Sequence, residues 1–177
     1  QSSNAMQFSK LQAAFYKSKI WDTSMDELVI EFLPPEPTDG EPQWTPYNKM
    51  EMLNGKNIDP LEKILREKVQ NGLSKQDAVK IVVKERIVPI VGLKIYFQGE
   101  VPSDNKKRTS VRIGFDSKGG AWSFLGTDVK NAQPGQKTMN LGWLDCAVIV
   151  HEFGHTLGLI HEHQNPKGGM QWDKEAV

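Results

Sequence analysis

The 177-residue sequence contains a single cysteine, no long apolar run and no excess of either charge. One cysteine cannot form an internal disulfide, and we interpret Cys146 as a small buried residue. No apolar segment approaches the ~20 residues that a membrane-spanning helix needs, so no membrane partner is expected. The 22 basic and 22 acidic side chains balance, and no basic cluster indicates binding to nucleic acid. The length fits one domain with a buried core.

Histidine is also scarce, and all four histidines fall in the stretch HEFGHTLGLIHEH, residues 151–163. Residues four apart in a helix lie on the same face, so His151 and His155 can offer two ring nitrogens to one metal ion. Gly158 can adopt the left-handed conformation that ends a helix and turns the chain. This turn would bring His161 back as a third ligand.

Three neutral histidines with a water molecule in the fourth position form an open zinc site, which is the catalytic arrangement. Zinc lowers the pKa of such a water to about 7. Glu152 lies beside the histidine pair without being a ligand, so it would take the proton of the attacking water and return it to the leaving amine. The pattern therefore predicts hydrolysis of a peptide bond.

The alternative interpretation is a buried helix whose histidines only hydrogen-bond to backbone carbonyls. The five fixed positions of HExxHxxGxxH would occur by chance in a chain of this length at on the order of one in 10⁵. This rarity favours the metal site, because each position also has a mechanistic reason.

The segment His151–His161 resembles the extended zinc signature of the metzincin metallopeptidases, and within that clan it is most similar to astacin-like enzymes. Three further stretches resemble astacin motifs: the SxxG strand, the strand before the zinc helix and the HEHxxP continuation, found here at Ser123–Gly126, Asn140–Gly142 and Glu162–Pro166. The resemblance implies one catalytic Zn²⁺ held by His151, His155 and His161, with Glu152 as general base. It also implies that the strand with Ser123, Phe124 and Leu125 pairs with an extended peptide or protein substrate.

The sequence departs from the astacin pattern in two places. It reads Asn165–Gly169 where astacins have a charged run, and Cys146 is alone where astacins have disulfides. We therefore describe the resemblance as that of a divergent, astacin-like metzincin. The resemblance implies secretion, although residues 7–19 are polar and amphipathic and do not form the apolar core of a signal peptide.

The remaining pattern predicts an α+β, zincin-like fold, with helices packed on a mixed twisted sheet. Strands are expected at residues 27–33, 93–97, 109–115, 121–125 and 138–141. Helices are expected from Asp59 to Asn71, from Ser74 to Pro89 and over the zinc motif, where Asp145 is the cap and Ala147, Val148 and Val150 would pack on the sheet. A short helix carrying Phe8, Leu11 and Phe15 and a proline-rich loop over residues 34–60 complete the prediction.

We interpret residues 1–5 as an expression remnant and residues 6–177 as a single metallopeptidase catalytic domain. Metzincins carry a methionine turn and a C-terminal subdomain after the third histidine. Sixteen residues follow His161 here, and Met170 lies in GGMQW, which differs from the SxMxY turn of the family. We therefore expect this sequence to be the N-terminal subdomain of a longer protein, binding zinc weakly and hydrolysing peptides slowly by itself.

Two functions are consistent with these patterns. The first is a zinc-dependent endopeptidase, and the second is an inactive zinc-binding protein that binds peptides or protein partners. Glu152 favours the enzyme because a protein that only binds zinc does not need the general base. The sequence leaves the substrate, the compartment and the oligomeric state open.

Overall fold

The computed structural model describes residues 14–15, 17–46 and 58–161. A five-stranded sheet is its centre, in the order β3-β2-β4-β6-β5. Its strands are β2 (Glu27–Phe32), β3 (Lys94–Phe97), β4 (Thr109–Gly114), β5 (Ala121–Ser123) and β6 (Met139–Leu141). β2 runs parallel to β3 and β4, β4 runs parallel to β6, and β5 is antiparallel to β6. The predicted α+β fold with a mixed sheet is confirmed.

The inner strands form the centre of the core because their apolar residues face it at alternate positions. Ile30 of β2 lies opposite Phe97 of β3 on one side and Val111 of β4 on the other, and all three are at most 2% exposed. In the same way, Ile113 of β4 lies opposite Met139 of β6. These contacts fix the position of the strands against which the helix with the zinc motif packs.

The helices begin where their capping residues predict. Asp59 accepts a hydrogen bond from the backbone N–H of Leu61 at 2.8 Å and begins α2 (Pro60–Gln70). Ser74 accepts one from Asp77 at 3.1 Å and begins α3 (Lys75–Val82). A π-helical turn, η2 (Val83–Ile87), and a short 3₁₀ turn, η3 (Val88–Ile90), follow α3. None of the helices in the described part of the chain is long and apolar enough to cross a membrane.

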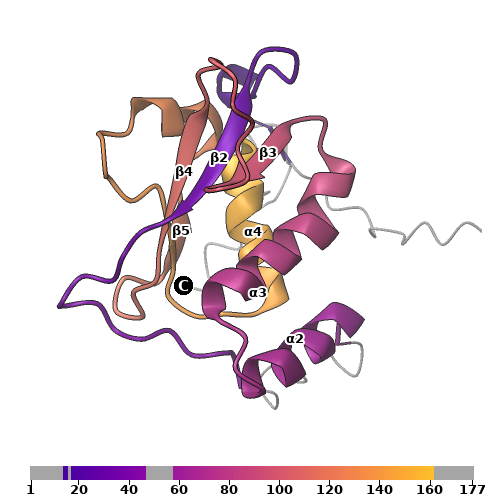
Figure 1. Cartoon of the computed structure of the whole chain (residues 1–177), viewed down its shortest axis with the longest axis vertical. Helices are drawn as coiled ribbons and strands as arrows, with labels where there is room; N and C mark the ends of the chain where they lie inside the picture. The colour runs from indigo at the N-terminus through magenta and orange to yellow at the C-terminus, as the bar shows by residue number, and fades with distance from the viewer. Residues whose placement is uncertain (1–13, 16, 47–57, 162–177) are drawn as a thin grey trace, which may run out of the picture.

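The third long helix, α4 (Cys146–Thr156), carries the zinc motif and lies between the sheet and α3 (Figure 1). Its buried face includes Cys146, Ile149 and Phe153, which follow at helical spacing and are at most 5% exposed. The prediction that Ala147 packs on the sheet is wrong. Ala147 is exposed, because the face that contacts the sheet and α3 is centred on Ile149. The predicted burial of Cys146 is confirmed, and burial raises the pKa of its thiol, so the side chain stays neutral.

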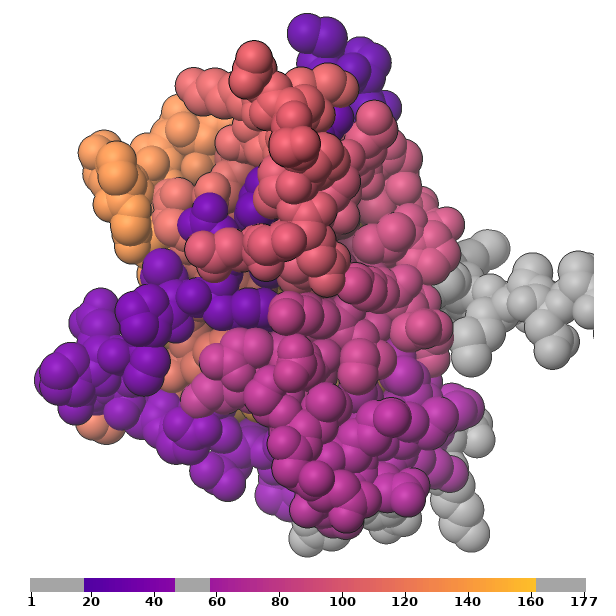
Figure 2. All heavy atoms as spheres, in the orientation of Figure 1, coloured from indigo at the N-terminus to yellow at the C-terminus, as the bar shows by residue number. Residues whose placement is uncertain are grey.

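The segment after β2 has little regular structure as far as Pro46, which confirms this part of the predicted loop; residues 47–57 lie outside the described residues. In the space-filling view the segment lies against α2 and α3 (Figure 2). It also contacts the chain just before α4. The Thr45 N–H donates to the carbonyl of Leu144 at 2.9 Å, and the Leu144 N–H donates to the carbonyl of Gln43 at 3.0 Å.

A second, two-stranded sheet pairs the beginning of the described chain with its end. β1 (Ala14–Phe15) runs antiparallel to β7 (Leu159–Ile160), and a 3₁₀ turn, η1 (Lys17–Lys19), follows β1. The helix predicted to include Phe15 is therefore wrong at this residue, because the backbone pairs with β7 instead. Phe8 and Leu11 lie outside the described residues.

Candidate metal centre

The helix α4 holds the first two predicted ligands. Asp145 begins the helix by accepting a hydrogen bond from the Val148 N–H at 2.7 Å, which confirms the predicted cap. His151 and His155 lie one turn apart on the same face, and their Nε2 atoms are 3.1 Å apart. Two ring nitrogens that face each other so closely form the beginning of a metal site.

A turn at Gly158 brings the third predicted ligand back to this pair. α4 ends at Thr156, and Gly158 has φ +99°, a conformation that side chains other than glycine rarely adopt. A Cβ atom at this position would also lie 3.2 Å from the carbonyl oxygen of Lys19. The chain then forms β7 and reaches His161. Gly158 thus lies in the turn that directly follows α4.

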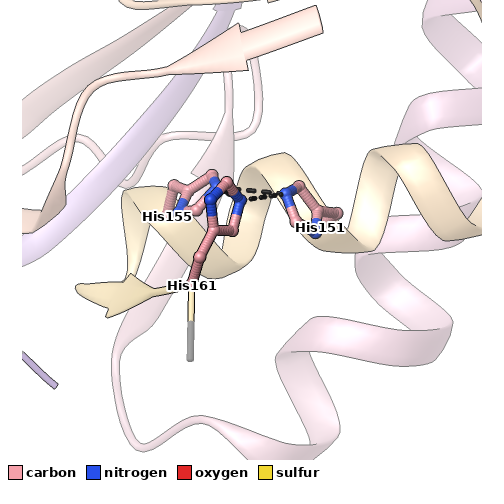
Figure 3. A group of neighbouring side chains, drawn as sticks. All are labelled: His151, His155 and His161. Carbon is pink, nitrogen blue, oxygen red and sulfur yellow. Dashed lines mark hydrogen bonds between the residues drawn. The ribbon is translucent and has the colours of Figure 1, made fainter. Parts of the chain in front are cut away.

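The three imidazole rings converge (Figure 3). The Nε2 atom of His161 lies 3.0 Å from that of His151 and 3.1 Å from that of His155. A tetrahedral zinc ion with Zn–N bonds of 2.0–2.1 Å separates its nitrogen ligands by about 3.3 Å. The three nitrogens therefore fit a single ion of this size. Within the described residues, no other group of three or more His, Cys, Asp or Glu brings its ligand atoms so close together.

The second ring nitrogen of His155 fixes the orientation of its imidazole. Nδ1 lies 2.7 Å from the carbonyl oxygen of Leu159. Because a carbonyl only accepts, Nδ1 donates the proton, and the neutral ring presents the lone pair of Nε2 to the other two histidines. Burial foremost, followed by the electrostatic effect of the neighbouring His155 and His161 imidazoles, lowers the pKa of His151. Both effects favour the neutral imidazoles that bind metal.

Glu152 follows His151 in α4 and is 4% exposed. Its Oε2 makes no hydrogen bond within the described part of the chain. Burial raises the pKa of this carboxyl group, and the electrostatic effect of the nearby His155 opposes the shift only in part. A buried carboxylate oxygen without a partner is unfavourable, and such groups are found where a ligand, water or ion completes the site. The predicted role of Glu152 as general base remains a prediction.

The strand β5, with the predicted substrate-contacting residues Ser123 and Phe124 at its end, forms one edge of the sheet. The hydroxyl of Ser123 donates to the carbonyl of Phe124 at 2.9 Å and lies 2.7 Å from the hydroxyl of Thr156 in α4. The side chain of Ser123 thus attaches the edge strand to α4. Leu125 follows, and its carbonyl accepts from Asp128 at 3.0 Å, at the beginning of η4 (Gly126–Asn131).

The backbone of β5 has groups that point away from the sheet. The Phe124 N–H donates to the carbonyl of Thr138 at 2.8 Å, so Phe124 is hydrogen-bonded to the neighbouring chain segment. In an antiparallel pair, residues with bonded groups alternate with residues whose N–H and C=O point outward. Ser123 is therefore the residue with outward groups at this end of the strand, and any peptide added to the edge would pair with it.

Trp21, which supports the end of α4, lies far from the site in the sequence, and the sequence did not predict this contact. The buried Trp21 donates from Nε1 to the carbonyl oxygen of Thr156 at 2.7 Å, in the last turn of α4. The carbonyl oxygen of Lys19 lies so close to Gly126 that a side chain there would clash with it. The pairing of β1 with β7, the approach of Lys19 to Gly158 and the hydrogen bond of Trp21 place residues 14–15 and 19–21 against the segment that leads to His161.

Comparison with known proteins supports the class of site that this geometry indicates. Residues 95–168 match the family model of the astacin peptidases. A solved structure of myroilysin is similar in fold, with a TM-score of 0.52 and 24% sequence identity over 91% of this chain and 61% of that chain. A crystal structure of myroilysin aligns with 23% identity over 92% of this chain and 64% of that chain, with a TM-score of 0.38. No curated protein sequence matches the chain.

The family match includes most of β3, continues through α4 and contains all three histidines of the cluster, so the resemblance to astacin-like metzincins that we inferred from the motifs is confirmed. The match begins after α2 and α3, so both helices lie outside it. The chain spans less than two thirds of the length of the myroilysin chains. At this identity the likeness to myroilysin concerns the fold.

Proposed function

We propose that the chain is a zinc-dependent endopeptidase that uses His151, His155 and His161 as metal ligands and Glu152 as general base. The observations that carry the proposal are the convergence of three Nε2 atoms, 3.0 to 3.1 Å apart, and the unpaired oxygen of the buried carboxylate of Glu152, the residue that follows His151. Zinc bound by these nitrogens would polarise the peptide carbonyl and lower the pKa of a water molecule to about 7.

The residues of the chain would divide the remaining chemistry between them. Glu152 would accept the proton of the attacking water at Oε2 and deliver it to the leaving amine. The hydrogen bond from His155 to the carbonyl of Leu159 would keep that ring in place during the reaction.

An endopeptidase also needs to hold an extended substrate. β5 lies at the edge of the sheet and is joined to α4 through Ser123 and Thr156. A peptide pairing with the outward groups of Ser123 would lie along this edge, next to the helix with the metal ligands. Such pairing recognises the backbone of the peptide, so by itself it predicts broad side-chain specificity.

The proposal is tested by metal content together with cleavage of an unfolded, dye-labelled protein. We expect about one zinc ion per chain and cleavage that a chelator abolishes. Glu152→Gln should retain zinc and cleave at least about a hundredfold more slowly, the effect expected from loss of a general base. Glu67→Gln, which changes an exposed glutamate of α2, is the matched control.

Two results would contradict the proposal. If Glu152→Gln binds zinc and cleaves as fast as the unchanged chain, Glu152 is not the base. If the unchanged chain binds zinc but cleaves no unfolded protein, the inactive zinc-binding protein becomes the better description.

A further inference from the structure

The first turn of α4 is held by a residue from another helix. Glu62 of α2 accepts a hydrogen bond from the Cys146 N–H through Oε2 at 2.6 Å. The side chain of Glu62 is fully buried, and 84 residues separate it from Cys146 in the sequence. The first N–H groups of a helix have no partner within the helix. Glu62 thus binds a group that Asp145, the local cap, leaves unpaired.

The charge of Glu62 is balanced by a closed network of contacts. Oε1 accepts from Nε of Arg66 at 2.7 Å, and Nη2 of Arg66 donates to the carbonyl of Thr45 at 2.5 Å. The hydroxyl of Thr45 donates to Oδ2 of Asp145 at 2.5 Å, which returns the network to the beginning of α4. Three separate segments of the chain therefore meet at the amino terminus of this helix.

Packing alone does not explain a buried glutamate here. A buried ion pair can often be replaced by apolar residues of similar volume with little loss of stability. An apolar residue cannot accept the Cys146 N–H, and it cannot place a negative charge at the positive end of the helix dipole. Glu62 supplies both. These properties act on the position of α4 rather than on the general stability of the core.

The position of α4 matters because His151 and His155 on this helix must lie close to His161, which a separate segment holds. α4 has eleven residues, a length at which an isolated helix is only marginally stable in water. Cys146 lies five residues before His151, about 7.5 Å along the helix axis. His161 is attached to the other end through Gly158 and β7. A shift or fraying of the first turn would therefore move His151 relative to His161.

We propose that Glu62 is a positioning residue of the metal centre. It holds the amino-terminal turn of α4 so that His151 and His155 lie at the right distance from His161. The identity of the metal as zinc rests on the function proposed above. Glu62 lies outside residues 95–168, so the segment that matches the astacin family takes part of its support from a helix beyond the match.

The test measures the affinity for zinc, by competition with a coloured chelator, and the visible spectrum of the cobalt-substituted protein. The main variant is Glu62→Leu with Arg66→Met, which removes both charges and keeps the volume. We expect its melting temperature without metal to fall by several degrees, because the buried Cys146 N–H and the Thr45 carbonyl lose their partners. Its dissociation constant for zinc should rise about tenfold, the lower end of the effect of losing a group that orients ligands. The cobalt bands should weaken or shift, because they report ligand geometry.

Ser74→Ala is the control for stability. It removes the cap of α3 and not that of α4, so it should lower the melting temperature and leave the zinc dissociation constant unchanged. Glu62→Gln keeps an oxygen that can accept from Cys146 but loses the charge. A neutral acceptor is weaker, so its dissociation constant should rise about threefold.

The outcomes separate the two proposals. If the unchanged chain binds zinc and the double variant binds it equally well with the same cobalt spectrum, Glu62 is only structural and the inference is overturned. If the double variant does not fold, Glu62→Gln decides, and an unchanged zinc affinity in a folded Glu62→Gln protein overturns the inference. A parent chain that binds no zinc overturns both the proposed function and this inference.

Discussion

The indole Nε1 of Trp21 donates a 2.7 Å hydrogen bond to the carbonyl oxygen of Thr156, 135 residues later in the sequence. Thr156 is the last residue of α4, where the carbonyl groups have no partner within the helix. Both residues are at most 5% exposed. The hydrogen bond therefore satisfies a buried helix carbonyl and fixes the end of the helix from which the chain turns toward His161.

Trp21→Phe should destabilise the metal-free protein by about 2 kcal/mol, because the carbonyl of Thr156 loses its buried donor. The measurement is chemical unfolding followed by circular dichroism. Trp143→Phe is the matched control, since Trp143 is 44% exposed and its replacement should change stability by less than about 0.5 kcal/mol. Equal unfolding midpoints for the two variants would show that the hydrogen bond does not stabilise the end of α4.

His161→Ala should weaken zinc binding far more than His163→Ala. The Nε2 of His161 faces the other two ring nitrogens at 3.0 to 3.1 Å, and its loss removes one of three ligands. We expect an affinity loss larger than the about 10–100-fold typical of groups that only orient a ligand. Equilibrium dialysis with zinc checks this for both variants, and similar losses for the two would mean that the third ligand is wrongly assigned.

The features that could be predicted from the sequence depend on residues close together in the chain. Asp59, Ser74 and Asp145 begin helices because each cap bonds a backbone N–H two or three residues later. The convergence of the histidines follows from helical spacing and the conformation of Gly158 in the same way. Local hydrogen bonding and local backbone geometry decided these features, so the sequence pattern was sufficient.

The features that could not be predicted depend on contacts between distant segments. Which face of α4 is buried is set by its contacts with the sheet and α3, so Ile149 and not Ala147 faces the core. In the sequence, Glu62 looks like an ordinary charged residue on an amphipathic helix. Its role is visible only where α2 meets the beginning of α4.

The acid sensitivity of the fold should depend on Asp104. Both oxygens of this carboxylate accept hydrogen bonds from Arg108, at 2.7 and 2.8 Å. These hydrogen bonds are the main reason that the pKa of Asp104 is lowered to about 2. Arg108 also bonds Glu27, at the beginning of β2, which Lys94 and Lys106 approach as well. Because the folded pKa lies below the ordinary value of 3.8, this contribution to stability is present above pH 3.8 and is lost as the pH falls toward 2.

Asp104→Asn should therefore lower the urea midpoint near neutral pH, and its difference from the unchanged chain should shrink between pH 4 and pH 2. Urea titrations at several pH values measure this difference, with Glu67→Gln on the exposed face of α2 as the control. A difference that stays constant down to pH 2 would mean that the Asp104 carboxylate contributes nothing through its charge.

The last prediction concerns how the edge strand β5 binds substrate. A proline at Phe124 is not a clean test, because the Phe124 N–H bonds Thr138 and its loss would weaken the pairing of β5 with the sheet. Ser123 is the better position, since the alternation of the strand directs its N–H outward. Ser123→Pro removes this donor and leaves the bond between Phe124 and Thr138 in place.

If a peptide pairs with this edge, Ser123→Pro should lower kcat/KM about five- to tenfold, the effect of one hydrogen bond of about 1 kcal/mol. Ser123→Ala is the necessary control, because it loses the same contact with Thr156 but keeps the outward N–H. Both variants should retain zinc, so the comparison isolates the backbone donor from the metal site. Equal kcat/KM for the two, with zinc bound in both, would place the substrate elsewhere than along β5.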